Sequence, residues 1–207
     1  MLKLEDFIIK TIEADGNCFY RTISYFFRKT EEDYKEFREL IVRYIENNQE
    51  EYIYYVPNED INILEEEEEI DIFNKKRDYI LNYAQTAKQD GTFAGDIEIA
   101  TTCILLNCNI KMYLLENNCF RLLYNYNMSE NNSNIVNENI DILFINNNHF
   151  NLLIPKKNSN INNRSLIEQK IELKKMEKIL INKINNSKTK IKDIFNLKIK
   201  KKLYVNY

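Results

Sequence analysis

The sequence predicts an α+β fold, in which helices pack on a small central β-sheet and a largely helical extension follows at the C-terminus. Between residues 18 and 106, apolar side chains recur at the three- and four-residue spacing of amphipathic helices. Between residues 109 and 154, short runs of β-type residues are separated by Asn-rich turns. Helices followed by a cluster of strands are typical of α+β domains. The chain has 207 residues, 44% of them hydrophobic, which is enough for one such domain with a sizeable core and an appendage.

Four helices are expected before the strands. The first spans residues 18–27, and Thr30 can cap the second, because the acidic turn that follows it favours the positive end of the helix dipole. The third spans residues 74–87, and the fourth begins at Asp96 and ends near Leu106. The expected inner faces consist of Tyr34, Phe37, Leu40, Ile41, Tyr44 and Ile45 in the second helix and of Ile97, Ala100, Ile104 and Leu105 in the fourth.

The strands are expected at residues 110–115, 120–126, 140–145 and 150–154. Asn117-Asn118 has the composition of a tight hairpin turn, and the polar residues 127–139 are expected to form a mobile loop. The five glutamates at residues 65–69 are expected to form a loop or an exposed acidic segment, because like charges favour solvation.

The four cysteines indicate neither a metal site nor a disulfide framework. Cys18, Cys103, Cys108 and Cys119 form no C-x-x-C pair and have no histidine cluster near them. The last three lie in apolar patterns and are expected in the core. The N-terminus lacks the apolar segment of a signal peptide, and no apolar run reaches the ~20 residues that span a bilayer. We therefore expect a cytoplasmic protein, or one delivered to a host cytosol if the source is an intracellular parasite or symbiont.

The net charge of −3 hides two oppositely charged parts. Residues 1–154 carry 28 acidic and 14 basic side chains, a net charge of −14, whereas residues 155–207 carry 4 acidic and 15 basic ones, a net charge of +11. The division predicts a domain at residues 1–155 and a basic, largely helical extension at residues 156–207. The acidic domain would attract a basic partner rather than nucleic acid. The extension can contact an anionic surface (a membrane or nucleic acid) or another protein, and its apolar stripe can pack on the domain, on a second copy or on an anionic surface.

The strongest functional signal is the pairing of one cysteine with the only histidine. Cys18 begins the first expected helix, where the positive end of the helix dipole favours the thiolate. His149 precedes the last expected strand and can take the thiol proton, and an adjacent imidazolium would lower the thiol pKa further. Asn151 lies on the same side of that strand and can accept a hydrogen bond from the imidazole, which fixes its tautomer. The turn at residues 15–17, whose sharp angle Gly16 permits, leaves backbone N–H groups to bind an oxyanion.

Each of these residues also has an ordinary structural explanation. The sequence at 15–17 is typical of turns, and free cysteines are more often buried than catalytic. The joint pattern favours chemistry, because each candidate lies at the boundary of an element and has its helper at the right offset. Asp96 and Glu98 could be acid–base carboxylates, but helix capping by Asp96 and solvent exposure of Glu98 are the simpler expectations.

Three motifs resemble those of a known family. Residues 15–24 (DGNCFYRTIS) closely resemble the nucleophile motif of the ovarian tumour (OTU) family of cysteine proteases. Residues 95–100 (GDIEIA) look like its central helix motif, and residues 148–151 (NHFN) look like its histidine motif. The motifs occur in family order, and the resemblance covers about residues 8–154.

The resemblance implies a papain-like cysteine protease fold and a deubiquitinase, which hydrolyses the peptide or isopeptide bond after the C-terminal Gly of ubiquitin without a metal or cofactor. It implies that Cys18 is the nucleophile, that His149 is the general base and then acid, and that Asn151 orients the imidazole. Asp15 matches the position whose backbone helps to build the oxyanion hole. Ubiquitin or polyubiquitin chains would be the partner, and the acidic domain is compatible with the arginine-bearing tail of ubiquitin.

The same resemblance implies that Gly16, Asn17, Phe93 and Phe150 line the substrate channel. The family usually has an aromatic residue, often Trp, and a Gly before the Gly-Asp pair, where this chain has Phe93 and Ala94. Two alternatives remain open at this point: a catalytically inactive ubiquitin-binding module, and a thiol hydrolase that acts on another ubiquitin-like modifier or on a peptide.

Overall fold

The computed structural model describes residues 2–63, 67–126 and 138–156. The helices are α1 (Cys18–Arg28), α2 (Tyr34–Asn47), α3 (Glu69–Ala87) and α4 (Asp96–Leu106). The strands are β1 (Leu2–Lys3), β2 (Phe7–Lys10), β3 (Cys108–Glu116), β4 (Cys119–Tyr126), β5 (Glu138–Ile145) and β6 (His149–Pro155). Single turns of 3₁₀ helix occur at η1 (Leu4–Asp6), η2 (Gln49–Glu51), η3 (Ile53–Tyr55) and η4 (Asn58–Asp60).

Two of the four helices begin elsewhere than the sequence predicts. Helix α2 starts after Asp33 at its N-cap, because the hydroxyl of Thr30 accepts the N–H of Glu32 at 3.2 Å in a turn that precedes the helix. Helix α3 begins at Glu69, so the last glutamate of the acidic run is helical. Acidic side chains suit the first turn of a helix, where they face the positive end of its dipole. The predictions for residues 64–66 fall outside the described residues.

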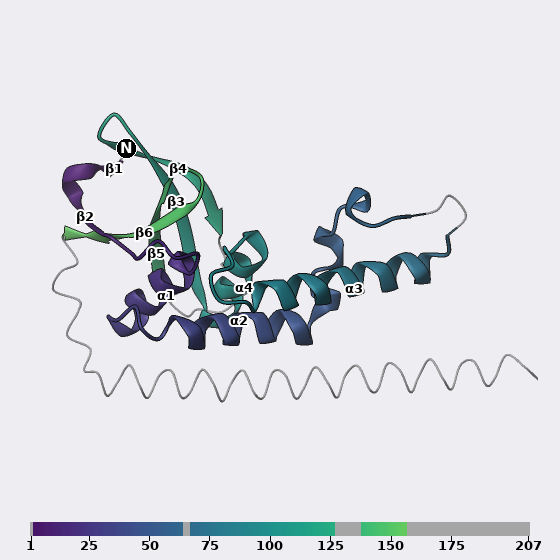
Figure 1. Cartoon of the computed structure of the whole chain (residues 1–207). Helices are drawn as coiled ribbons and strands as arrows, with labels where there is room; N and C mark the ends of the chain where they lie inside the picture. The colour runs from purple at the N-terminus through teal and green to yellow at the C-terminus, as the bar shows by residue number, and fades with distance from the viewer. Residues whose placement is uncertain (1, 64–66, 127–137, 157–207) are drawn as a thin grey trace, which may run out of the picture. The chain divides into compact units, whose positions relative to one another are not determined.

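The six described strands form one mixed sheet in the order β1-β4-β3-β5-β6-β2 (Figure 1). Strands β3 and β5 are parallel, and the other neighbours are antiparallel. The four predicted strands are present, and Asn117 and Asn118 link β3 to β4 with φ angles of 49° and 59°, as a tight hairpin turn requires. Strand β5 includes residues 138–139 of the predicted loop, and residues 127–137 lie outside the described part.

The sheet is strongly curled, and the N-terminal segment closes it. Phe7 on β2 and Phe120 on β4 are four strand positions apart in the sheet, which would separate them by about 19 Å if it were flat. Their ring centroids lie 5.3 Å apart, edge to face. Strands β1 and β2 are joined only by η1, yet they pair with opposite sides of the sheet, β1 with β4 and β2 with β6. Residues 2–10 therefore bridge the two edges of the curl.

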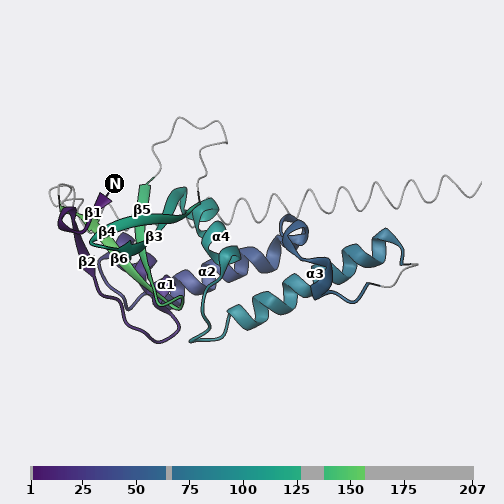
Figure 2. The same ribbon diagram turned by 90° about the horizontal axis from the view of Figure 1, so that it is seen from above.

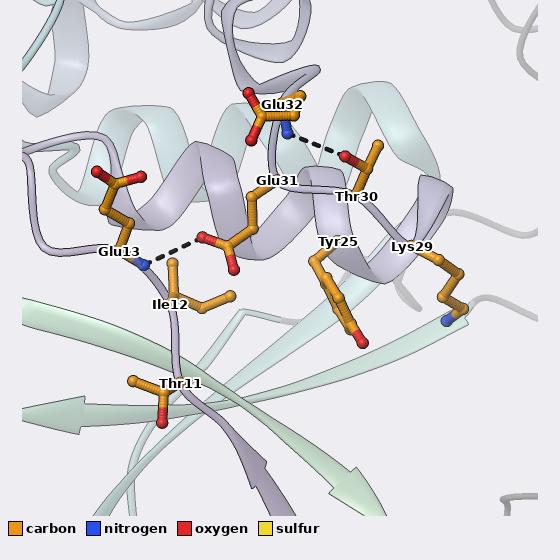
Figure 3. Close-up of a pocket in the computed structure, with 8 residues that line it drawn as sticks. All are labelled: Thr11, Ile12, Glu13, Tyr25, Lys29, Thr30, Glu31 and Glu32. Carbon is orange, nitrogen blue, oxygen red and sulfur yellow. Dashed lines mark hydrogen bonds between the residues drawn. The ribbon is translucent and has the colours of Figure 1, made fainter.

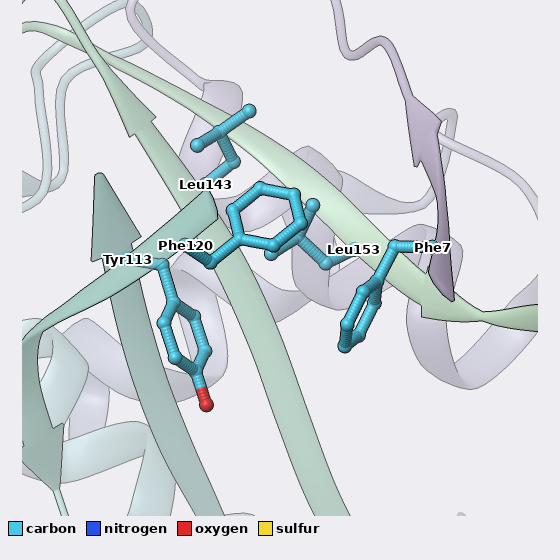
Figure 4. Packing of buried hydrophobic residues seen from close by; sticks show 5 residues of the cluster. All are labelled: Phe7, Tyr113, Phe120, Leu143 and Leu153. Atoms are coloured by element: carbon cyan, nitrogen blue, oxygen red, sulfur yellow. The ribbon is translucent and has the colours of Figure 1, made fainter. Parts of the chain in front are cut away.

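The two faces of the sheet bury different clusters. On one face, Phe150 of β6 contacts Phe19 of α1, and α4 packs against β3 (Figure 2). Consecutive residues of a strand point to opposite faces. The other face accordingly holds a second cluster inside the curl, which consists of Phe7, Tyr113, Phe120, Leu143 and Leu153 (Figure 4). Helices α2 and α3 pack side by side in both overall views and extend past the sheet (Figures 1 and 2).

The predicted basic extension, residues 156–207, lies outside the described residues except for Lys156, so the domain boundary at residue 155 stays a prediction. In the ranges 2–63, 67–126 and 138–156, no helix combines the length and the apolar character needed to cross a membrane.

Candidate active site

Cys18 occupies the first turn of α1, as its place in the sequence predicts. Asn17 is at the N-cap, but its side chain makes no capping hydrogen bond to the helix. Cys18 is 1% exposed, so its sulfur lies beneath the surface of the free protein. The first turn of a helix has N–H groups without helical acceptors, and those of Cys18 and Phe19 lower the pKa of the thiol.

His149 and Asn151 are brought together at the start of β6. The Nε2 atom of His149 lies 3.0 Å from Oδ1 of Asn151, and the backbone N–H of Ile12 donates to the same oxygen at 2.9 Å. Because Oδ1 only accepts, Nε2 must carry the proton in this contact. In the neutral imidazole, Nδ1 of His149 is then the nitrogen without a proton, and it can act as a base. Asn151 is buried, so the segment after β2 and strand β6 together fix the orientation of the imidazole.

The start of α1, with Cys18, and the start of β6, with His149 and Asn151, lie next to each other. The backbone N–H of Phe150, the residue between His149 and Asn151, lies near enough to the sulfur of Cys18 to lower the pKa of the thiol. The rings of Phe19 and Phe150 pack edge to face with centroids 5.8 Å apart. The N-terminus of α1 therefore lies directly against the first residues of β6.

The protonation of Cys18 differs from the prediction. Burial raises the pKa of the Cys18 thiol above its ordinary value, and this outweighs the three N–H groups, which lower the pKa. The negative charge of Asp15 raises the pKa further. The expectation that the thiolate is favoured is therefore wrong for the free protein, because burial raises the pKa of the thiol more than the nearby N–H groups lower it.

Asp15 organises the loop before α1 through its side chain. Its carboxylate accepts hydrogen bonds from the backbone and side-chain N–H groups of Asn17 (2.9 and 2.8 Å) and from Nε and Nη2 of Arg21 (3.0 and 2.7 Å). Burial alone would raise the pKa of Asp15, but the hydrogen bonds from Arg21 and Asn17 hold it well below its ordinary value. The backbone N–H of Asn17 is thus occupied, which corrects the expectation that the amides of this turn are all unpaired.

The four residues predicted to line a substrate channel have unequal exposure. A Cβ atom on Gly16 would lie 1.8 Å from the carbonyl oxygen of Gly91, so this glycine allows two loops to touch backbone to backbone, and its φ of +82° also favours Gly. Asn17 and Phe150 are 2% and 1% exposed. Phe93 is 39% exposed and stacks on Phe150 with centroids 4.9 Å apart. Among the three side chains of this set, Phe93 is the one that a ligand can reach without rearrangement.

A buried polar cluster beside the loop was not predicted. Glu98 is 1% exposed, so the expectation that it is exposed to solvent is wrong. Its Oε2 atom accepts hydrogen bonds from the N–H of Gly95 at 2.9 Å and from the hydroxyl of Tyr83 at 2.6 Å. Gly95 is the N-cap of α4, so Asp96 does not cap it and instead accepts the hydroxyl of Tyr126 at 2.5 Å. Burial raises the pKa of Glu98. The spacing of Gly95 and Glu98 matches that of a capping box, and this signal could have placed the carboxylate.

Arg38 is buried as well, and it was not predicted to be. It lies four residues after Tyr34 and three before Ile41, inside the apolar stripe of α2. That position was the available signal, because residues at this spacing share a helix face.

A separate pocket of about 440 Å³ lies near this site (Figure 3). It is lined by Thr11, Ile12, Glu13, Tyr25, Lys29, Thr30, Glu31 and Glu32. It includes neither Cys18 nor His149, and Glu31 spans its wall by accepting the N–H of Glu13 at 3.1 Å. Within the part of the chain that the structure describes, no group of three or more His, Cys, Asp or Glu side chains is arranged to hold a metal ion.

Comparison with known proteins identifies relatives of this arrangement. A curated protein of Arabidopsis thaliana, named OVARIAN TUMOR DOMAIN-containing deubiquitinating enzyme 7, is 29% identical over 103 residues, which are 48% of this chain and 22% of the relative. The chain therefore matches about a fifth of the length of that relative. Among solved structures, the viral OTU domain protease from Farallon virus is similar with a TM-score of 0.56 and 20% identity, over 75% of this chain and 89% of that chain. The OTUD1 OTU domain is similar with a TM-score of 0.53 and 20% identity, over 72% and 87% of the two chains.

These structures share the α+β fold of the present chain. The sequence profile of OTU-like cysteine proteases matches residues 13–150, two thirds of the chain, and this range includes both Cys18 and His149. The chain therefore belongs to the family of OTU-like cysteine proteases.

Proposed function

We propose that the protein is a deubiquitinase, which hydrolyses peptide or isopeptide bonds after the C-terminal Gly of ubiquitin with Cys18, His149 and Asn151. The observation that carries the proposal is the contact between α1 and β6, where the ring of Phe19, next to Cys18, packs against the ring of Phe150, next to His149, and the imidazole is oriented by Asn151. Membership of the family and the name of the Arabidopsis relative support ubiquitin as the substrate. The net charge of −14 on residues 1–154 suits a basic peptide tail.

The reaction begins from a protonated thiol, because burial raises the pKa of Cys18. Nδ1 of His149 takes the thiol proton as the sulfur attacks the carbonyl carbon of the ubiquitin C-terminus. The oxyanion that forms is stabilised by backbone N–H groups at the start of α1, and each such donor contributes about 3 to 4 kcal/mol. The imidazolium then protonates the leaving amine, which leaves a thioester on Cys18. Water, deprotonated by His149, hydrolyses this thioester and releases ubiquitin and the free thiol.

Ubiquitin with an electrophile at its C-terminus tests the proposal. We expect the wild-type protein to form a covalent adduct at Cys18 and to cleave diubiquitin. The variants Cys18→Ala and His149→Ala should lose cleavage, and Asn151→Ala should reduce it. Cys119→Ala is the matched control, because this partly exposed thiol lies at the start of β4 and its loss should leave labelling unchanged. A folded wild-type protein that is not labelled at Cys18 would contradict the proposal.

One observation favours a second candidate, an inactive ubiquitin-binding domain. Cys18 is 1% exposed and its thiol is protonated in the free protein, as expected of a site that no longer reacts. Binding of ubiquitin without adduct formation or cleavage would favour this candidate. A panel of differently linked diubiquitins and probes made from ubiquitin-like modifiers separates both candidates from a hydrolase with another substrate.

A further inference from the structure

We propose that Arg38 is a positioning residue that holds the loop before Cys18 against the loop at residues 88–95, acting through Asn17. The inference rests on the proposed function of Cys18. Arg38 is 4% exposed, and no ion pair involves it among the residues that the structure describes. The guanidinium lies over the ring of Tyr20, 4.1 Å from its centroid, and interacts electrostatically with the buried carboxylate of Glu98. The role proposed here depends on its hydrogen bonds, whose donors lie in the fixed plane of the guanidinium.

The guanidinium joins three separate segments. Its Nη1 donates to the carbonyl oxygen of Ala87, the last residue of α3, at 2.6 Å. Its Nη2 donates to the carbonyl oxygen of Thr92 at 2.7 Å and to Oδ1 of Asn17 at 2.6 Å. The planar fork of an Arg side chain can hold these donors in a fixed mutual geometry, whereas a Lys ammonium is a single flexible point charge.

These bonds turn the Asn17 side chain away from its own helix. An Asn at the N-cap ordinarily accepts an N–H of the first helical turn, but here the Oδ1 atom is taken by the guanidinium and by the N–H of Gly91 at 3.0 Å. The Nδ2 group donates to Asp15 at 2.8 Å. The first-turn N–H groups of α1 therefore have no side-chain cap, and those of Cys18 and Phe19 lower the pKa of the thiol.

The two loops that Arg38 joins both contact the site. Gly16 and Gly91 meet backbone to backbone, and a Cβ atom on Gly16 would clash with Gly91. In the second loop, Phe93 stacks on Phe150, whose ring packs against that of Phe19, the residue after Cys18. Without the guanidinium, Asn17 would be free to cap α1 and the loops would be free to separate.

The test compares Arg38→Lys and Asn17→Ala with the wild-type full chain. Arg43→Lys is the matched control, because Arg43 lies on the same helix but is exposed and forms an ion pair with Glu39. For each protein, kcat and KM are measured on ubiquitin with a fluorogenic C-terminal amide. The rate of Cys18 alkylation by iodoacetamide is measured by mass spectrometry from pH 6 to 10, and folding is checked by thermal melting.

We expect Arg38→Lys and Asn17→Ala each to lower kcat by about 10- to 100-fold, because small misplacements of reacting groups cost this much, with KM within about threefold of wild type. The kcat of the double variant, Arg38→Lys with Asn17→Ala, should be no more than about twofold below that of Asn17→Ala alone, because the two side chains act as one unit. The alkylation profile should shift to higher pH in both single variants and stay unchanged in Arg43→Lys.

If Arg38→Lys does not fold, Asn17→Ala still decides the matter, because it leaves the guanidinium bonded to both carbonyl groups. A folded variant with unchanged kcat and an unchanged alkylation profile would overturn the inference, as would losses that multiply in the double variant. The alkylation profile can be measured without ubiquitin turnover. If the wild-type protein does not cleave ubiquitin, the proposed function fails, but the alkylation profile still tests the role of Arg38.

Discussion

The buried sulfur of Cys18 leads to a prediction about its reactivity in the free protein. Because burial raises the pKa of the thiol, the rate of alkylation by iodoacetamide should keep increasing above pH 8.5, the ordinary value for a cysteine, rather than level off near neutrality. Peptide mapping after timed reaction gives the rate at Cys18 and, in the same sample, at the partly exposed Cys119. A plateau below pH 7 at Cys18 would indicate a thiolate–imidazolium pair already formed at rest.

Asp15 should make folding stability depend on pH. Its pKa in the folded protein lies well below the value of about 3.9 in the unfolded chain, because the bonds from Arg21 and Asn17 outweigh burial. The stabilisation is therefore fully present above pH 4 and is lost as the pH falls toward the folded pKa. Asp15→Asn should lower the free energy of unfolding by about 1.5 to 3 kcal/mol at pH 7, and the difference should shrink below pH 4.

Urea unfolding between pH 3 and 7 measures this effect. Glu13→Gln is the control, because Glu13 contacts the same Arg21 at 3.1 Å but is 63% exposed, where an ion pair contributes little. Equal losses in the two variants, or a loss independent of pH, would contradict the role given to Asp15.

At the scale of elements, the curl of the sheet depends on residues 2–10. Phe7 is 8% exposed and inserts its ring among residues of four other strands, whereas Ile8, next to it on β2, is 49% exposed. Phe7→Ala should lower the free energy of unfolding by about 3 to 5 kcal/mol, and Ile8→Ala by less than about 0.5 kcal/mol. Urea unfolding of the full-length variants measures both. A small effect of Phe7→Ala would mean that the curl is held without this segment.

This segment also shows which elements the sequence could not reveal. Strands β1 and β2 have two and four residues, too few to display an alternating pattern, and they pair with strands more than 100 residues away. By contrast, α1, α4 and the four later strands are long enough for periodicity to identify them. Periodicity failed on the inner face of α4, because that helix is apolar on nearly all sides and buries Thr101 and Thr102 instead of the predicted set.

The candidate site was predictable to the extent that its residues belong to short motifs. Cys18, His149 and Asn151 stand at element boundaries, where local chemistry singles them out. Residue type does not distinguish Arg38 from the exposed Arg43 on the same helix, so its place within the apolar stripe of α2 was the one signal of its burial. Its burial depends on carbonyl groups that only the folded chain brings within reach.

At the scale of the whole molecule, the opposite charges of the two parts predict how salt affects its partners. Residues 1–156 carry 28 acidic and 15 basic side chains, a net charge of −13, against −3 for the full chain. A more negative protein attracts a basic partner more strongly, and salt screens that attraction.

A chain that ends at Lys156 should therefore keep its kcat on ubiquitin while kcat/KM falls more steeply between 50 and 300 mM salt than for the full chain. It should also lose binding to vesicles that contain anionic lipid, if the basic extension provides that binding. Full-length protein with Lys200, Lys201 and Lys202 replaced by Gln is the control that keeps the length but lowers the charge, and its salt dependence should lie between the other two. Identical salt profiles and identical vesicle binding for all three proteins would show that the extension's charge acts on neither partner.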